Sequence, residues 1–203
     1  MMSWMSLSEK ILVLNTDIDT KKFAKKVLKN EQKIIKKYPP TSYHNTITDG
    51  GTGLGINSLT SRFFHFNVLK WMGTRSLKKW IRLGYEQYTG LEGESLYCQC
   101  WANVMRDGQK INSHKHLEFH TDTNHYLCGN FVVQCNGSTN TYYQNTPVLN
   151  TEGDITFFSG NVLHWTDTHH GNFERITVAF DICSEEYMRH TPKEELNNRW
   201  IRI

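Results

Sequence analysis

Histidines are concentrated in the second half of the 203-residue chain. Imidazole is the commonest protein ligand for iron, zinc and copper, and a hydrophobic core does not require a cluster of this kind. The sequence therefore predicts a metal site in this region. Seven of the ten histidines lie here, at His114, His116, His120, His125, His164, His169 and His170.

Two short motifs could each supply a first pair of ligands. The side chains of His114 and His116 point to the same face if the segment is a strand, and so do those of His120 and Asp122. The second pair has the chemistry of the facial triad of non-haem Fe(II) oxygenases, which combines two histidines with one carboxylate. His164, at the end of an apolar stretch, is the candidate for a third ligand from a separate strand.

The segment 174–181 alternates strictly between polar and apolar residues and places Arg175 and Thr177 on one face. An arginine that points inward must meet an anion, because an unpaired buried guanidinium is very costly. That anion could be a ligand of the protein. A purely structural alternative is an ion pair of Arg175 with Asp154 or Asp181.

A turn at Thr168 to Asn172 would place Arg175 nearly opposite His164 across a hairpin. A dicarboxylate bound to the metal through its 2-oxo acid end would then reach Arg175 and the hydroxyl of Thr177 with its far carboxylate. This arrangement predicts a link between the metal and an anionic cosubstrate.

The elements that must position these residues are two helices followed by several strands. Apolar residues recur at helical spacing from Asp19 to Lys37 and from about Asn67 to Tyr88, with Met72 on the second stripe. The spacing then changes towards period two, and the pattern favours an α+β fold in which the helices brace a β-sandwich or jelly roll. Strands are predicted at Leu96–Met105, Tyr126–Gln134, Asp154–Trp165 and Glu174–Cys183, and a turn with a short helix after Ser184.

One domain is expected from the length of the chain. Within it we predict a helical and loop extension over residues 1–93, a β core over residues 94–183 and a tail over residues 184–203.

Three blocks of the β half resemble the 2-oxoglutarate/Fe(II)-dependent oxygenase superfamily, in the prolyl-hydroxylase-like branch that includes small bacterial and phage proteins. The first block is Trp101-Ala102-Asn103-Val104 with Gly108 and the His114 motif after it. The second is the strand-like segment Leu127 to Phe131. The third and most specific runs from Gly153 through His164 to Arg175 and Thr177, similar to the family's distal histidine and its Arg-x-Thr pair.

The resemblance implies a double-stranded β-helix that uses Fe(II), 2-oxoglutarate as cosubstrate and O₂ to hydroxylate a substrate. It assigns the metal to His114, His116 and His164, and the cosubstrate to Arg175, Thr177 and Asn103. Asn103 could equally have a structural role between strands.

The first metal motif departs from the family pattern, which is His-x-Asp or His-x-Glu. The pair at the expected distance from Gly108 is His114-x-His116, and we therefore favour it. The pair His120-x-Asp122 remains the alternative.

Two other functions remain open. A cupin-like dioxygenase with three histidines and no 2-oxoglutarate would suit the histidines but would leave Arg175 unexplained, and a non-catalytic β-sandwich module could keep them only as a zinc site. The substrate could be a prolyl or other peptidyl group, a free amino acid or a nucleobase. The loop from Thr46 to Ser58 is expected to help select it.

Composition narrows the class of protein. Hydrophobic residues make up 38% and charged residues 21%, no stretch is apolar enough to cross a bilayer, and the run Ile11 to Leu14 is too short for a signal peptide. Five cysteines without disulfide spacing predict a reducing, cytoplasmic location, with Cys98 and Cys100 as buried thiols rather than a zinc site. The net charge is only +3, but eight lysines lie close together in one N-terminal segment. We expect them to form a solvated helix face and do not expect the protein to bind nucleic acid. They are Lys21, Lys22, Lys25, Lys26, Lys29, Lys33, Lys36 and Lys37.

Overall fold

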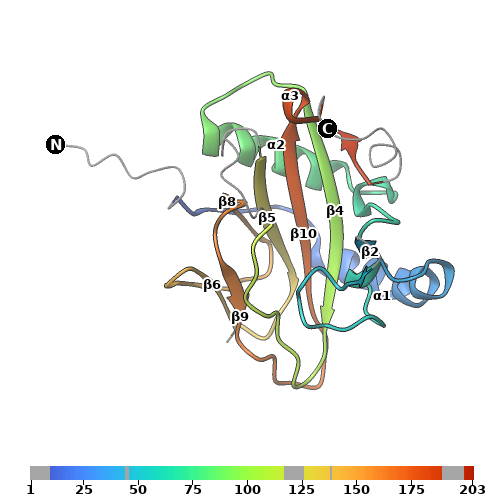
Figure 1. Ribbon diagram of the computed structural model, residues 1–203. Coiled ribbons are helices and arrows are strands. Elements are labelled where there is room, and N and C mark those ends of the chain that lie inside the picture. The colour runs from blue at the N-terminus through green and yellow to red at the C-terminus, as the bar shows by residue number, and fades with distance from the viewer. Residues whose placement is uncertain (1–9, 44–45, 117–125, 138, 189–198) are drawn as a thin grey trace.

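Two antiparallel sheets form the framework of the protein in the computed structural model, which describes residues 10–43, 46–116, 126–137, 139–188 and 199–203. The larger sheet has six strands in the order β1-β8-β5-β10-β4-β11 (Figure 1). Its long central strands have the bounds predicted from the sequence within one residue. They are β4 (Leu96–Met105), β5 (Tyr126–Gln134) and β10 (Arg175–Ser184), flanked by β1 (Leu12–Asn15), β8 (Asp154–Ser159) and β11 (Ile201–Arg202).

The smaller sheet has the order β7-β6-β9 and lies over one face of the larger sheet, with side chains of both sheets lining a single pocket. Its strands are β6 (Asn140–Tyr143), β7 (Thr146–Leu149) and β9 (His164–Thr166). The chain passes back and forth between the two sheets, as in a jelly roll. The protein is therefore a double-stranded β-helix with helices packed against it, as predicted.

The predicted strand Asp154–Trp165 is wrong as one element. It forms β8 and β9, which belong to different sheets and are separated by a turn in which Val162 N–H donates to the carbonyl of Ser159. Ser159-Gly160-Asn161 is turn-forming sequence, but the apolar residues Val162 and Leu163 after it continued the apolar stretch and hid the break.

Two helices cover the face of the larger sheet that points away from the pocket (Figure 1). These are α1 (Thr20–Lys37) and α2 (Arg75–Thr89), whose buried side chains share one core with Val178 and Phe180 of β10. Gly84 lets α2 approach the sheet closely, because a Cβ at this position would lie 2.0 Å from Cζ of Phe157. The alternation of β10 thus sends its apolar residues into this core, whereas Arg175, Thr177 and Ala179 line the pocket on the other face.

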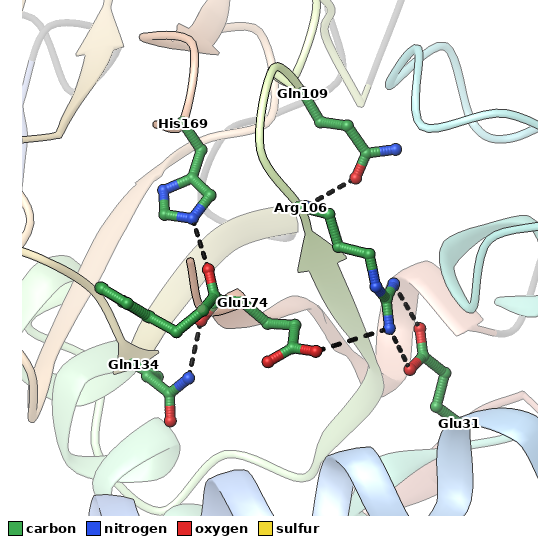
Figure 2. A network of polar contacts seen from close by, with 7 residues as sticks. Glu31, Arg106, Gln109, Gln134, His169 and Glu174 are labelled. Atoms are coloured by element: carbon green, nitrogen blue, oxygen red, sulfur yellow. Dashed lines mark hydrogen bonds and ion pairs between the residues drawn. The ribbon is translucent and has the colours of Figure 1, made fainter. Parts of the chain in front are cut away.

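Helix α1 begins where the sequence predicted. The Asp19 carboxylate accepts a hydrogen bond from the backbone N–H of Lys22 and caps the first turn. Its single acidic residue, Glu31, points inward and binds Arg106, just after β4, through two hydrogen bonds of 3.1 and 2.8 Å (Figure 2). The helix is thereby held to the sheet, while its lysines, apart from the partly buried Lys26, are exposed as predicted.

The second predicted helix is interrupted. Residues Val68–Lys70 form the short 3-10 helix η3, and α2 begins only at Arg75, because Gly73 adopts a left-handed conformation with φ of 78°. Met72, which the helical spacing placed on the apolar stripe, lies in this break and is 89% exposed.

The remaining elements are short. Strands β2 (Ser42–Tyr43) and β3 (Thr46–Ile47) pair with each other, η2 (Thr60–Arg62) follows the glycine-rich loop, and α3 (Glu185–Met188) follows β10. Among the helices of the described residues, none has the length and apolar character needed to span a membrane.

Candidate metal and anion site

Three histidines from two neighbouring segments meet at the pocket. His114 forms a backbone bridge with His164 of β9, with N–H···O distances of 3.1 and 3.0 Å, and the N–H of His116 donates to the carbonyl of Gly160. The segment 114–116 therefore adds to the edge of the smaller sheet beside β9. One ring nitrogen from each of the three histidines lies within 4.8 Å of the others, which is close enough to share one ion.

Hydrogen bonds orient all three imidazole rings in the same way. Nδ1 of His114 lies 2.8 Å from the carbonyl oxygen of Asn112, and Nδ1 of His164 lies 3.0 Å from that of Val162. Nδ1 of His116 lies 2.5 Å from a carboxylate oxygen of Asp181. Because these oxygens only accept, each Nδ1 carries the proton, and Nε2 of each ring keeps a free lone pair.

Burial favours the neutral form of the imidazole rings, which is the form that binds a metal ion. Burial, followed by the proximity of His116, lowers the pKa of His114 to about 4. The pKa of His164 is lowered well below its usual value by burial and by its two histidine neighbours. Both rings are thus held neutral at physiological pH, ready to donate a lone pair.

Arg175 lies in the same pocket, at the start of β10, with only 1% of its surface exposed. Its guanidinium contacts Sδ of Met105 at 3.7 Å and Oγ1 of Thr141 at 3.3 Å, and its Nε has no partner in the described structure. Burial lowers the pKa of Arg175 to about 10, because removing the guanidinium from water disfavours its charged form.

The structural alternative for Arg175 is excluded by these contacts. Asp181 is bound to His116, and the carboxylate of Asp154 accepts from Nδ2 of Asn15 at 2.8 Å. No carboxylate of the described residues forms an ion pair with Arg175. A buried cation with an unsatisfied donor therefore faces the pocket.

The predicted hairpin between His164 and Arg175 does not form. Strand β9 pairs with β6, whereas β10 pairs with β4 and β5, so the two residues belong to different sheets. They line the same pocket because the two sheets face each other. The prediction failed because it assumed that consecutive strands are also neighbours in one sheet.

Polar contacts fix the turn that leads into Arg175 (Figure 2). The ring of His169 is fully buried with its Nε2 2.7 Å from the carbonyl of Phe173, and Gln134 donates to the carbonyl of Glu174 at 2.7 Å. His169 thus has a structural role, and His170 is exposed beside Asp107. The alternative ligands His120 and Asp122, like His125, lie outside the described residues.

The other predicted cosubstrate residues also line the pocket. Thr177 faces Asn103 of β4 across the ladder, with Nδ2 of Asn103 3.5 Å from Oγ1 of Thr177. Oδ1 of Asn103 accepts a hydrogen bond of 2.7 Å from the Thr60 hydroxyl, so this side chain already joins β4 to η2.

Sequence reasoning missed the contribution of β6. Thr141 contacts Arg175, and the buried ring of Tyr143 stacks on His164 with centroids 6.2 Å apart. The alternation in Asn140–Tyr143 and the tight turn at Gln144, where φ is 54°, were the available signals. The strand lacks aliphatic residues and was therefore not recognised.

Cys98 and Cys100 are both fully buried on β4, and burial raises the pKa of each thiol well above its usual value. Neither belongs to a group of potential ligands among the described residues. These features agree with the prediction of inert core thiols.

Comparison with known proteins identifies the fold. No family model matches the chain, and no curated protein matches it either. Among solved structures, the class that shares its fold is that of the 2-oxoglutarate/Fe(II) oxygenases, with prolyl hydroxylases among them. The resemblance inferred from the sequence is confirmed at the level of the fold.

Three of these structures show the extent of the likeness. A viral collagen prolyl hydroxylase from Paramecium bursaria Chlorella virus-1, in complex with 2-oxoglutarate, superimposes with a TM-score of 0.58 at 11% identity over 88% of this chain and 98% of the other. The 2-oxoglutarate-dependent epimerase SnoN of nogalamycin biosynthesis gives 0.52 at 11% identity over 86% and 78%. A Pseudomonas putida prolyl-4-hydroxylase gives 0.50 at 11% identity over 85% and 92%.

Proposed function

We propose that the protein is an Fe(II) oxygenase that couples the oxidative decarboxylation of 2-oxoglutarate to the hydroxylation of a substrate. The observation that carries the proposal is a buried Arg175 whose Nε has no hydrogen-bond partner among the described residues, in the pocket that also holds three histidines. A buried guanidinium without an anion is costly, and a bound carboxylate removes that cost.

The side chains that line the pocket fit both iron and 2-oxoglutarate. His114, His116 and His164 would hold the iron through Nε2, since each Nδ1 is already hydrogen bonded. Three protein ligands leave positions for a 2-oxo acid and for O₂. The distal carboxylate of 2-oxoglutarate would bind Arg175, which is able to form two parallel hydrogen bonds to it.

When bound, iron and 2-oxoglutarate supply the oxidising chemistry, in which O₂ is consumed, the cosubstrate becomes succinate and carbon dioxide, and one oxygen atom enters a C–H bond of the substrate. The residues of this chain bind and orient both molecules. Tyr143 and Phe158 provide apolar walls beside His164, which limit the access of water to the metal side of the pocket.

The identity of the substrate is a separate part of the proposal. The prolyl hydroxylases among the neighbours support a peptide, or a small molecule with a comparable C–H group. The glycine-rich loop before η2 reaches the site, because the carbonyl of Thr52 accepts a hydrogen bond of 2.8 Å from Asn112 and Thr52 lines the pocket. We propose that this loop contacts the substrate next to His114.

The cysteines of the chain are free, which supports the proposed cytoplasmic location.

A three-histidine dioxygenase that does not use 2-oxoglutarate is the second candidate, and the absence of a carboxylate among the three clustered side chains favours it. It offers no anion for Arg175, however. Dependence of turnover on 2-oxoglutarate separates the two functions.

The test is succinate formation by the purified protein supplied with Fe(II), 2-oxoglutarate and O₂. His164→Ala should abolish it, because an open site would lose one ligand of three. His170→Ala is the matched control, since His170 is exposed and lies outside the pocket. Succinate formation that is equal in both variants, or that is absent from the wild type although Fe(II) binds, would contradict the proposal.

A further inference from the structure

A buried carboxylate stands directly behind one of the three histidines. Asp181 of β10 is 3% exposed, and its Oδ1 lies 2.5 Å from Nδ1 of His116. Hydrogen bonds to a buried carboxylate favour its ionised form, and this contact is shorter than the Nδ1 contacts of His114 and His164.

Asp181 does not line the pocket that the three histidines share. Together with His116 and Cys128 it forms a second group of potential ligands. The short distance to Nδ1 argues against an ion between them, because two ligand atoms about 2.1 Å from one octahedral metal are roughly 3 Å apart. The contact is a hydrogen bond, and it leaves Nε2 of His116 as the ring nitrogen available to a metal.

The three histidines supply no negative charge of their own, whereas a facial triad of two histidines and a carboxylate supplies one. Within the described part of the chain, Asp181 provides the only carboxylate that is hydrogen bonded to any of them. Position 116 is also where the family pattern has its acidic ligand. In this protein the negative charge is thus carried by Asp181, which stands behind His116 and would not contact the metal itself.

We propose that Asp181 is a positioning residue that delivers this charge to the metal through His116: it fixes the Nδ1–H tautomer and makes Nε2 a more strongly donating ligand. The inference rests on the proposed function in one respect, since it takes the three histidines to bind the metal. Outer-shell carboxylates of this kind typically change metal affinity by about 10- to 100-fold.

The central variant is Asp181→Asn, which keeps the shape of the side chain and an oxygen that can accept from Nδ1 but removes the charge. Glu31→Gln is the matched control, because it also neutralises a buried, hydrogen-bonded carboxylate, 4% exposed, on the opposite side of the larger sheet. Both proteins are checked for folding by circular dichroism and then titrated with Co(II), whose visible bands report binding.

We expect the affinity of Asp181→Asn for Co(II) to fall by about 10- to 100-fold and that of Glu31→Gln to stay within about twofold of the wild type. The Fe(III)/Fe(II) reduction potential should rise in Asp181→Asn, since lost negative charge disfavours Fe(III); a purely structural role would not move the potential in a set direction. Unchanged affinity and potential in the folded variant would overturn the inference.

The wild type supplies a second test that does not depend on folding of the variant. Nitrogen-15 NMR with Zn(II) should show that His116 retains its Nδ1 proton and coordinates through Nε2. Loss of that proton on metal binding would make Asp181 and Nδ1 direct ligands and would refute the positioning role. If the wild type and His164→Ala bind Co(II) equally, the proposed metal site itself is wrong, which is a distinguishable result.

Discussion

Replacing Arg175 should weaken the binding of 2-oxoglutarate and leave the binding of iron unchanged. The guanidinium is 1% exposed and has no carboxylate partner among the described residues, so a bound carboxylate would be fully desolvated against it. Truncating one partner of such a pair costs about 2 to 5 kcal/mol, which corresponds to a loss of affinity on the order of 100-fold or more.

Two variants separate charge from shape. Arg175→Met keeps a long side chain against Met105 and removes the charge, and it should lose the full amount. Arg175→Lys should recover only part of the affinity, because an ammonium cannot match the two parallel hydrogen bonds of a guanidinium.

The assay is succinate formation as a function of 2-oxoglutarate concentration, together with anaerobic Fe(II) titration of each variant. Because the guanidinium is held by Thr141 and Met105, and no contact with the three histidines is seen, Fe(II) affinity without cosubstrate should be that of the wild type. A folded Arg175→Met protein with the 2-oxoglutarate dependence of the wild type would refute the reasoning and place the cosubstrate elsewhere.

Three further outcomes are expected. His114→Ala should reduce turnover far more than His120→Ala, measured as succinate formed per minute, and the reverse ranking would move the first ligand pair to the alternative motif. The pKa of His114 falls from 6.5 to about 4 on folding, so the unfolded metal-free chain binds more protons than the folded chain between these pH values. The contribution of His114 to the free energy of unfolding should therefore be complete above pH 6.5 and decrease by up to roughly 3 kcal/mol towards pH 4, as measured by urea denaturation. Gly84→Ala should destabilise the protein by about 1 to 3 kcal/mol in the same assay, because the added Cβ would overlap the ring of Phe157. Ser76→Ala, on the exposed side of α2, is the control and should be nearly neutral. Equal urea midpoints for these two variants would show that α2 can shift to accommodate the added Cβ.

Much of the framework could be predicted because the pattern of the residues coincides with burial. Strand β10 alternates between pocket and core from Arg175 to Phe180, and the same alternation that defined the strand also placed Arg175 and Thr177 together on one face. The histidine motif and His164 were recognisable by residue type alone, and the structure brings them together.

The errors arose where tertiary contacts override local pattern. The turn after β8 and the break at Gly73 occur inside stretches whose apolar spacing continues past them. Strand β6 was missed because it is short and has no aliphatic residue; its inward residues Thr141 and Tyr143 line the pocket, and Tyr143 also packs in a small hydrophobic cluster.

The partner of His116 could not be foreseen from spacing. Asp181 lies 65 residues from His116 along the chain, so only the tertiary fold could bring the two side chains together. The same applies to Thr141 and Arg175, which come from different sheets.

The most direct test of the account is whether one pocket binds iron and 2-oxoglutarate together. Purified protein is titrated with Fe(II) without oxygen and then with 2-oxoglutarate, and visible absorption is recorded; succinate, which has two carboxylates but no 2-oxo group, serves as the control ligand. A weak visible band that saturates at about one equivalent of 2-oxoglutarate and is absent with succinate is the predicted result. Stoichiometric iron binding with no change on adding 2-oxoglutarate would contradict the account.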